Sequence, residues 1–382
     1  MKKIIKTSVA VALLLAAMLT VTISTHTVYA DTAYSARAAL LMDYDTGEVL
    51  FSQNETDRLQ IASMVKIMTL NLIFDEIDCG NLSIDDEISV SQNASGMGGS
   101  QAFLDAGCSY KADELIKSII VASANDSCVA MAEHIAGSVS GFVARMNDKA
   151  EKLGMTNTSF VNCTGLPAPN QYCCASDVAT MFRELVGHKQ FFDYSKIWMF
   201  DLVHPSGRVT QLSNTNKLIR FYEGCDGGKT GFTTEALSCL AATARRGDTR
   251  LISVIVGAPD SKTRNKEVSA MLNEGFANYE TRQYVFSQNS AGWANVNGGK
   301  EKTVECTPAE DYFVLTRKGE KRDVNIDFYY FTAAAPVRQG DVVGKATVTI
   351  DGEVVKEIDL IARSGVESRE FKDILDEVIK AW

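Results

Sequence analysis

The chain has 382 residues, of which 46% are apolar and 23% charged, and its 48 acidic residues outnumber 38 basic ones. A chain of this length and composition can bury full hydrophobic cores, and its length favours two domains over one. Disorder is not expected, because the apolar fraction is high and the net charge of −10 is small for the length. Nucleic-acid binding is disfavoured, since it depends on clustered lysines and arginines.

Residues 1–30 have the pattern of a secretory signal peptide. Lys2, Lys3 and Lys6 form a basic start, residues 9–21 form an apolar run, and Val28–Ala30 is a small-residue cleavage pattern. The run is short for a membrane span, although an uncleaved anchor stays an open alternative. Cleavage would remove three of the 38 basic residues and none of the 48 acidic ones, which leaves a net charge of −13.

The chain has nine cysteines, and none of them forms a Cys-x-x-Cys pair. An odd number leaves at least one free thiol in an exported protein. Buried, unpaired cysteines are the plainest interpretation, and they would indicate a host whose exterior is not strongly oxidising. The sequence predicts no metal site and no cofactor.

The first part of the chain is predicted to alternate strands and helices. Residues 37–52 indicate two strands with a turn at 45–47, and residues 61–74 are apolar on every side, which is typical of a buried helix. The spacing of apolar residues predicts four helices, a three-stranded meander and one more helix, at 113–122, 127–137, 142–153, 176–185, 229–233, 237–245, 250–256 and 264–279.

The composition shifts to Ser, Asn, Gly and Gln at residues 287–300, where we place a domain boundary. Strands are predicted after it, with a hairpin turn at Asp351-Gly352, at 312–316, 324–330, 343–350 and 353–361. A helix with one apolar stripe ends the chain. The predicted organisation is a signal peptide (1–30), a main domain (31–286), a β-rich domain (287–366) and an amphipathic helix (367–382).

The predicted buried helix contains one anomaly, Lys66, which is the only charged side chain between Arg58 and Asp75. Burying an ammonium costs several kcal/mol unless it is paired or loses its proton. Ser63 precedes it by three residues, so both side chains project from the same helix face. A desolvated lysine can act as the base that a serine nucleophile needs. A Ser63 helix cap beside a snorkelling Lys66 is the structural alternative.

Two further motifs carry chemistry. Lys229-Thr230-Gly231 offers a cation and a hydroxyl for a carboxylate, and the glycine lets a peptide lie against the backbone. The alternative is a surface strand end with a turn glycine. Ser123 and Asn125 lie in a break between two apolar helices, where helix capping is the better explanation for these residues taken alone.

The order Ser-x-x-Lys, Ser-x-Asn, Lys-Thr-Gly is the serine acyl-transferase signature of penicillin-binding proteins and class A β-lactamases. From about residue 33 onward the chain resembles the low-molecular-weight penicillin-binding proteins that are serine-type D-alanyl-D-alanine carboxypeptidases. The matching segments are Met42–Gly47, Ala62–Thr69, Gly99–Leu104, Ser123–Asp126, Ala132–Gly137, Leu153–Phe160 and Asp226–Thr233. The resemblance implies an α+β fold: an antiparallel sheet flanked by helices plus an all-helical cluster, then a small β-rich domain and a terminal amphipathic helix.

The resemblance also implies catalytic roles. Ser63 would attack the carbonyl that joins the last two D-alanines of a peptidoglycan stem peptide, with Lys66 as base. Backbone N–H groups of Ser63 and Phe232 would form the oxyanion hole. Ser123 would relay a proton to the leaving D-alanine, and Asn125 would contact the acyl-side amide.

The same resemblance implies that Lys229, Thr230 and Arg264 bind the terminal carboxylate beside Gly231. Water would then hydrolyse the acyl-enzyme. β-Lactams would also acylate Ser63, and their acyl-enzyme would hydrolyse slowly. Two departures from the family pattern concern this region: Thr215 stands where some members carry arginine, and Leu237 replaces a usual glycine. Both put substrate preference and rate in question more than the mechanism.

In the family, the terminal helix lies on the outer face of the cytoplasmic membrane, which implies a place in the extracytoplasmic cell envelope. The apolar stripe of residues 367–382 suits this, whereas their five acidic residues against three basic ones do not favour anionic lipid. Packing of the helix on the β-rich domain is the alternative.

Three other functions stay open from the residues alone. A class A β-lactamase would need a dedicated deacylating glutamate and would not need the C-terminal β-rich domain. A Ser-His-Asp hydrolase has little support, because His134, His188 and His204 lie in no recognisable motif. A catalytically silent wall-binding protein would have no need for Lys66 in a buried helix.

Overall fold

The computed structural model describes residues 33–380. The predicted signal peptide and Trp382 lie outside these residues. Within them, no single helix is both long and apolar enough to cross a membrane. Helices α5 (Asn125–Ala136) and α6 (Val139–Lys152) reach that length and composition only as a pair, and they meet at an angle of 84°.

A five-stranded antiparallel sheet of order β2-β1-β9-β8-β7 forms the centre of the main domain. Its strands are β1 (Ala38–Asp43), β2 (Val49–Gln53), β7 (Cys225–Thr233), β8 (Leu237–Arg246) and β9 (Thr249–Ala258). The predicted strand pair and the predicted meander therefore belong to one sheet. They join because β1 pairs with β9, with Ala38 opposite Val256.

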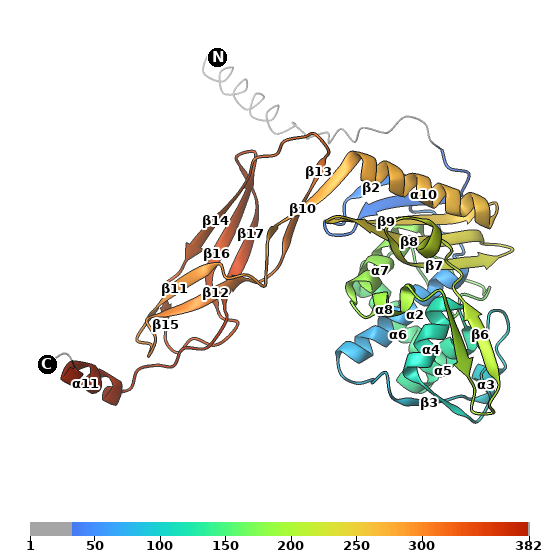
Figure 1. Cartoon of the computed structure of the whole chain (residues 1–382), viewed down its shortest axis with the longest axis horizontal. Coiled ribbons are helices and arrows are strands. Elements are labelled where there is room, and N and C mark those ends of the chain that lie inside the picture. The colour runs from blue at the N-terminus through green and yellow to red at the C-terminus, as the bar shows by residue number, and fades with distance from the viewer. Residues whose placement is uncertain (1–32, 381–382) are drawn as a thin grey trace, which may run out of the picture. The chain divides into compact units, whose positions relative to one another are not determined.

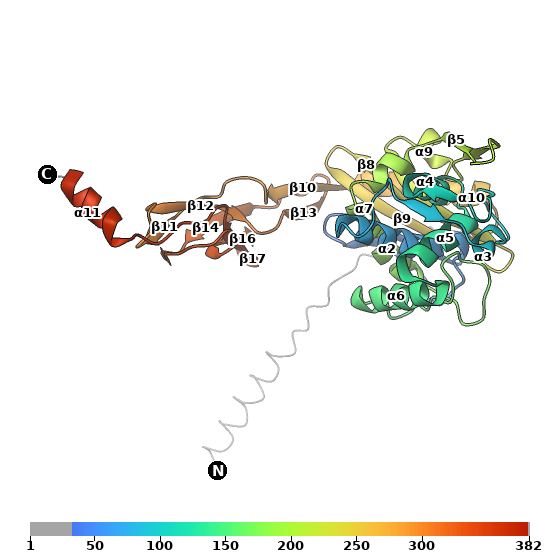
Figure 2. The same ribbon diagram turned by 90° about the horizontal axis from the view of Figure 1, so that it is seen from below.

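Helices cover both faces of this sheet (Figures 1 and 2). Helix α10 (Ser261–Asn278) packs on one face, where it shares a hydrophobic core with Leu41 and Ile255. Their strand neighbours Leu40 and Val254 face a second, larger core. This alternation has the period of two expected of a strand buried on both faces. The predicted antiparallel sheet flanked by helices is confirmed.

The larger core is built by a cluster of helices on the other face of the sheet. At its centre lies α2 (Lys66–Asp78), which follows the 3-10 turn η1 (Ala62–Val65), and all α2 residues from Lys66 to Phe74 are buried. The predicted buried helix is confirmed, although it begins as a 3-10 turn. The other helices of this cluster are α3 (Gln92–Ser95), α4 (Ala112–Val121), α5, α6, α7 (Ala175–Gly187) and α8 (Phe191–Ser195). Helix α9 (Leu218–Phe221) contributes Leu218 to the smaller core that α10 covers.

Two small two-stranded sheets lie at the edge of the helical cluster, and the second of them is a hairpin. The first pairs β3 (Glu87–Ser89) with β4 (Ser109–Lys111), and the second pairs β5 (Met199–Val203) with β6 (Val209–Ser213). Neither strand pair was predicted from the sequence. The hairpin β5–β6 bears on the site described below.

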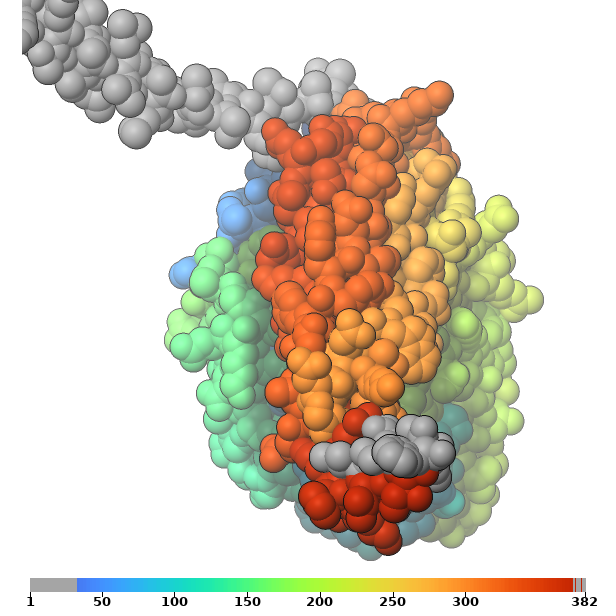
Figure 3. Space-filling model, turned by 90° about the vertical axis from the view of Figure 1, so that its left-hand side faces the viewer, coloured from blue at the N-terminus to red at the C-terminus, as the bar shows by residue number. Residues whose placement is uncertain are grey.

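The C-terminal part, orange to red in Figure 3, contains a six-stranded sheet of order β14-β16-β17-β12-β11-β15. Its strands are β11 (Gly292–Asn297), β12 (Thr303–Pro308), β14 (Val324–Tyr330), β15 (Ala333–Ala334), β16 (Val342–Ile350) and β17 (Glu353–Ala362). A separate pair, β10 (Tyr279–Val285) and β13 (Tyr312–Arg317), joins residues from both sides of the boundary predicted at 286/287. That boundary stays a prediction.

All nine cysteines are unpaired in the structure, and seven of them are buried. Burial raises the pKa of the Cys128 thiol to about 11. A buried thiol with a raised pKa is protonated at neutral pH and reacts poorly. These residues therefore pack as small hydrophobes, as the sequence predicted.

Candidate active site

Ser63 lies in the 3-10 turn directly before α2, and Lys66 is the first residue of that helix. The Lys66 Nζ atom is 3.1 Å from Ser63 Oγ. Ser63 is half-buried, whereas Lys66 is fully buried. The preceding residue, Ala62, has φ of +48°, a left-handed conformation that costs energy in a residue with a Cβ. The strained turn places the Ser63 hydroxyl against the lysine amine.

Lys66 has two further partners, and both can only accept hydrogen bonds from it. Its Nζ atom is 2.6 Å from Asn125 Oδ1 and 2.6 Å from the Thr164 carbonyl oxygen. Burial lowers the pKa of Lys66. A neutral amine has two N–H hydrogens and one lone pair, so these two acceptors leave the lone pair for the Ser63 hydroxyl. The geometry suits a general base acting on Ser63.

Asn125 begins α5, but it does not cap the helix. The N-cap residue is Ala124, which makes no side-chain cap hydrogen bond. The Asn125 amide instead accepts from Lys66 and donates through Nδ2 to the Gly98 carbonyl oxygen, at 2.7 Å. Helix capping, the better explanation from the sequence alone, is therefore wrong for Asn125.

The second lysine of the site, Lys229, lies in β7 and is 2% exposed. Its Nζ atom donates to Ser123 Oγ at 2.8 Å and to the Thr230 carbonyl oxygen at 3.1 Å. Ser123 has φ of +63°, a second left-handed residue beside the site. The alternative of an exposed strand end is wrong for Lys229, because the ammonium is buried against Ser123.

Gly231 brings strand β7 against the turn that carries Ser63. A Cβ atom at this position would lie 2.6 Å from the Ile61 carbonyl oxygen and 3.2 Å from the Ser63 backbone nitrogen. A side chain there would push the strand away from the nucleophile. The next residue, Phe232, follows on the same strand with its side chain 68% exposed.

Arg264 lies in the first turn of α10 and is buried. Its Nη1 atom is 3.4 Å from the carbonyl oxygen of Cys239, which is paired with Gly231 across β7 and β8. Its Nε and Nη2 atoms donate to Asn265 Oδ1. Arg264 therefore reaches the strand pair that carries Lys229.

Three basic side chains, Lys66, Lys229 and Arg264, are buried near one another in the site. Burial lowers the pKa of Lys229 well below its usual value, and the charges of Lys66 and Arg264 lower it further. Cations that repel one another in a poorly hydrated site gain most from a bound anion. The electrostatics therefore favour a negatively charged ligand beside Lys229.

Comparison with known proteins identifies the family. A model of the D-alanyl-D-alanine carboxypeptidase family matches residues 24–260, well over half of the chain. The chain belongs to this family of serine peptidases. A model of the penicillin-binding protein 5 C-terminal domain matches residues 279–368. The predicted family, its fold and its enzyme class are confirmed.

Individual relatives agree with this assignment. D-alanyl-D-alanine carboxypeptidase DacF of Bacillus subtilis (strain 168) is 38% identical over 357 residues, which cover 92% of this chain and 91% of that protein. DacC of Escherichia coli (strain K12) is 31% identical, with 88% and 85% covered. The crystal structure of penicillin binding protein 5 from Haemophilus influenzae superposes with a TM-score of 0.70, at 29% identity, and covers 88% of this chain and 99% of that one.

Two positions that depart from the family pattern contact residues of strand β7. Thr215, where some members carry arginine, receives a hydrogen bond from the Thr230 hydroxyl at 2.7 Å. Leu237, the first residue of β8, pairs with Thr233 at the end of β7. Leu237 has φ of +58°, which explains why glycine is usual there.

This strain can be measured with two variants that both remove the Leu237 side chain. Leu237→Gly is expected to be more stable than Leu237→Ala by about 1 kcal/mol, because only alanine keeps the left-handed strain. In an unstrained strand the order is the reverse, since glycine has the larger entropy cost. Urea denaturation of the two variants compares them. An alanine variant as stable as the glycine variant would show that Leu237 is not strained.

Two contacts of the site were not predicted from the sequence. The carbonyl oxygens of Thr164 and Gly98 hold Lys66 and Asn125, respectively. Because both are backbone groups in loops, the residue types at these positions do not indicate the contacts. A glycine beside each offers a weak signal: Gly165 has φ of +83°, and Gly99 has φ of +79°.

Proposed function

We propose that this site removes the terminal D-alanine from peptidoglycan stem peptides through an acyl-enzyme on Ser63. The observation that carries the proposal is the hydrogen bonding of the buried Lys66 amine. Its N–H groups donate to Asn125 Oδ1 and to the Thr164 carbonyl oxygen, so its lone pair remains for the Ser63 hydroxyl. As the Ser63 Oγ–carbon bond forms, the Ser63 proton passes to Lys66. Backbone N–H groups of Ser63 and Phe232 stabilise the oxyanion.

The peptide bond then breaks, and the proton that Lys66 took from Ser63 passes through Ser123 to the leaving D-alanine nitrogen. Asn125 contacts the amide on the acyl side. Lys229, Thr230 and Arg264 hold the carboxylate of the leaving residue, beside Gly231. A water molecule then hydrolyses the ester, which releases the shortened stem peptide and restores Ser63.

Binding of the carboxylate also adjusts the protonation of the two lysines. Burial disfavours charge on Lys229, and the nearby charges of Lys66 and Arg264 disfavour it further. A bound carboxylate raises the proton affinity of Lys229, and a charged Lys229 in turn favours a neutral Lys66. Substrate binding therefore prepares the base, and the carboxylate contributes to the reaction as well as to binding.

β-Lactams acylate the same serine, because their strained amide presents a carbonyl and a nearby carboxylate in the arrangement that the site binds. The direct test incubates the mature protein and Ser63→Ala with a fluorescent penicillin and with a pentapeptide that ends in D-Ala-D-Ala. Stable labelling and D-alanine release are expected, and both should be lost in the variant. Rapid penicillin turnover would instead indicate a β-lactamase, and absence of labelling would indicate a binding module.

We also propose that residues 1–30 direct export and that the enzyme acts in the extracytoplasmic cell envelope. Residues 31–286 would form the catalytic domain, residues 287–366 a β-rich spacer, and residues 367–382 an anchor on the outer face of the cytoplasmic membrane. The exposed apolar side chains of α11 (Phe371–Lys380) support the anchor. They are Phe371, Leu375 and Ile379, which recur every four residues on one helix face.

Liposome flotation tests this anchor. The mature chain is expected to float with vesicles of zwitterionic lipid, and a chain that lacks residues 367–382 is expected to stay at the bottom of the gradient. The apolar face drives this binding, since the acidic residues of the helix give no attraction to anionic lipid. Equal flotation of the two chains would rule out the anchor.

A further inference from the structure

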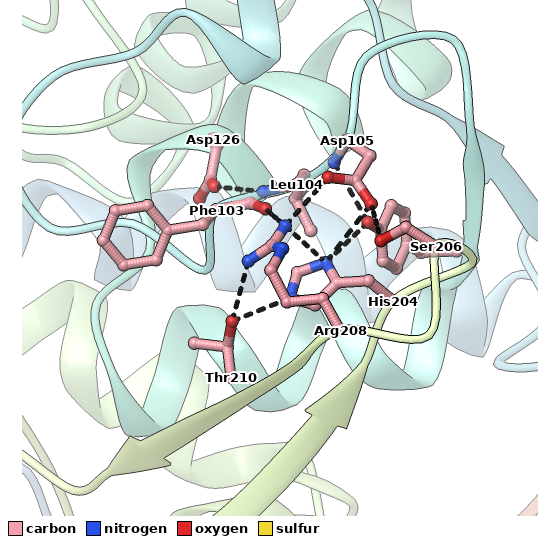
Figure 4. A network of polar contacts seen from close by, with 9 residues as sticks. Phe103, Leu104, Asp105, Asp126, His204, Ser206, Arg208 and Thr210 are labelled. Carbon is pink, nitrogen blue, oxygen red and sulfur yellow. Dashed lines mark hydrogen bonds and ion pairs between the residues drawn. The ribbon is translucent and has the colours of Figure 1, made fainter.

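The turn of the hairpin β5–β6 contacts the end of the loop 98–105, at Phe103 and Asp105 (Figure 4). Arg208, just before β6, donates through Nη2 to the Phe103 carbonyl oxygen at 2.5 Å and to Asp105 Oδ1 at 2.8 Å. Ser206 donates to the other oxygen of Asp105, at 2.9 Å. Charge-assisted bonds of this kind are stronger and more directional than neutral ones. We call Asp105, His204, Ser206 and Arg208 the hairpin clamp.

His204 is the buried residue of the hairpin clamp. Its Nδ1 atom faces the Tyr110 hydroxyl at 2.8 Å and Arg208 Nη2 at 3.2 Å, and its Nε2 atom faces the Thr210 hydroxyl at 2.8 Å. Arg208 can only donate, so Nδ1 accepts and Nε2 carries the hydrogen. Burial and the Arg208 charge lower the pKa of His204, in agreement with a neutral ring.

The first residues of α5 also bind this loop. The Asp126 carboxylate accepts from the backbone nitrogens of Ala102 and Leu104, at 3.0 and 3.1 Å. The Asn125 backbone nitrogen donates to the Ser100 carbonyl oxygen at 2.7 Å. The loop thus lies between two sets of polar contacts, with Phe103 at φ of +61° between them. A left-handed residue of this kind persists only where its surroundings fix it.

One atom of this loop sets the orientation of a catalytic side chain. The Gly98 carbonyl oxygen accepts from Asn125 Nδ2 at 2.7 Å. Because a carbonyl cannot donate, the amide nitrogen must face Gly98 and the amide oxygen must face Lys66. If the loop moved away, the Asn125 amide could turn and present its N–H groups to Lys66. The Lys66 lone pair would then have a donor other than Ser63.

We propose that Arg208 is a positioning residue for acylation, which acts through the loop 98–105 and Asn125 on the Lys66 amine. This inference rests on the proposed roles of Ser63 and Lys66. Arg208 touches neither residue, and its side chain is 42% exposed. Its effect comes from fixing Phe103 and Asp105, which fixes the loop and hence the Gly98 carbonyl.

A double-mutant cycle on the full mature chain tests the inference, with the acylation rate constant for a fluorescent penicillin as the readout. Arg208→Ala is expected to slow acylation about tenfold, since small misplacements of a catalytic group are costly. In the Asn125→Ala background the same change is expected to alter the rate less than twofold, because the residue through which Arg208 acts is absent. Arg245→Ala, which removes an exposed arginine of β8 beside the turn to β9, serves as the matched control and should leave the rate unchanged.

An unchanged rate in Arg208→Ala would overturn the inference, and so would an equal loss with and without Asn125. If Arg208→Ala fails to fold, Ser206→Ala replaces it in the same cycle. This variant removes one of the bonds to Asp105, and a loss of about two- to threefold is expected. Failure of the parent enzyme to label would overturn the proposed function, which is a separate outcome from failure of the cycle.

Discussion

Lys66→Met should lower the rate constant for acylation of Ser63 by about 10³-fold. Methionine has a similar length and fills the buried position, but it has no lone pair that can take the Ser63 proton. The variant should fold, because replacing a buried ammonium by an apolar side chain of similar volume is often neutral or stabilising. Stopped-flow labelling with a fluorescent penicillin measures the rate.

Lys149→Met is the matched control for this variant. Lys149 is also largely buried, but it forms ion pairs with Asp75 and Glu184 in the helical cluster. Its loss should affect stability and leave acylation unchanged. Equal losses of acylation in the two variants would show that Lys66 acts through the fold and not as the base.

The pH dependence of acylation gives an independent check on Lys66. A base must be unprotonated to act, so the rate should rise with pH as Lys66 loses its proton. Burial lowers the pKa of Lys66 from its ordinary value of 10.5, so the midpoint of this rise should lie below 10.5. A midpoint at or above the ordinary value would contradict a desolvated base.

The second large effect concerns Lys229 and the substrate carboxylate. Lys229→Met should lower kcat/KM by about 10²-fold for a stem peptide that ends in free D-Ala-D-Ala, because one partner of a buried charge pair is lost. For the same peptide with a C-terminal amide, the parent enzyme should already be slow. The variant should lose little more, since no carboxylate is present to pair with Lys229. Release of D-alanine or D-alaninamide measures both.

The comparison of the two peptides separates charge recognition from general damage to the site. A variant that loses activity equally on the acid and the amide has lost its geometry and not its charge. Thr230 offers a matched control on the same strand, because Thr230→Val removes a hydroxyl and keeps the charge of Lys229. This variant should show a smaller loss on the acid.

The sequence predicted the chemical core of the site because its residues conflict with their surroundings. A lone charge in an apolar helix identified Lys66, and an ordered set of short motifs brought in Ser123, Asn125 and Lys229. The structure places these side chains in two hydrogen-bonded groups: Lys66 contacts Ser63 and Asn125, and Lys229 contacts Ser123. Their catalytic roles stay predictions until variants are measured.

The features that were not predicted from the sequence are those in which backbone groups or polar surface residues make the contacts. The Thr164 and Gly98 carbonyls carry no residue-type signal, and the hairpin β5–β6 has a mixed, largely exposed sequence. Strand β11 lies in the polar stretch where we placed the domain boundary, and only Ala294 and Val296 of this strand are buried. Two small apolar residues between polar neighbours are too weak a pattern to predict a strand.

Mass spectrometry of the penicillin-treated enzyme tests the central claim most directly. The account predicts a mass increase of one intact penicillin per chain, located by proteolysis on the peptide that contains Ser63. It also predicts that the adduct persists after free penicillin is removed and is absent from Ser63→Ala. An adduct on any other residue, or an unmodified enzyme that converts penicillin to its hydrolysed product, would contradict the account.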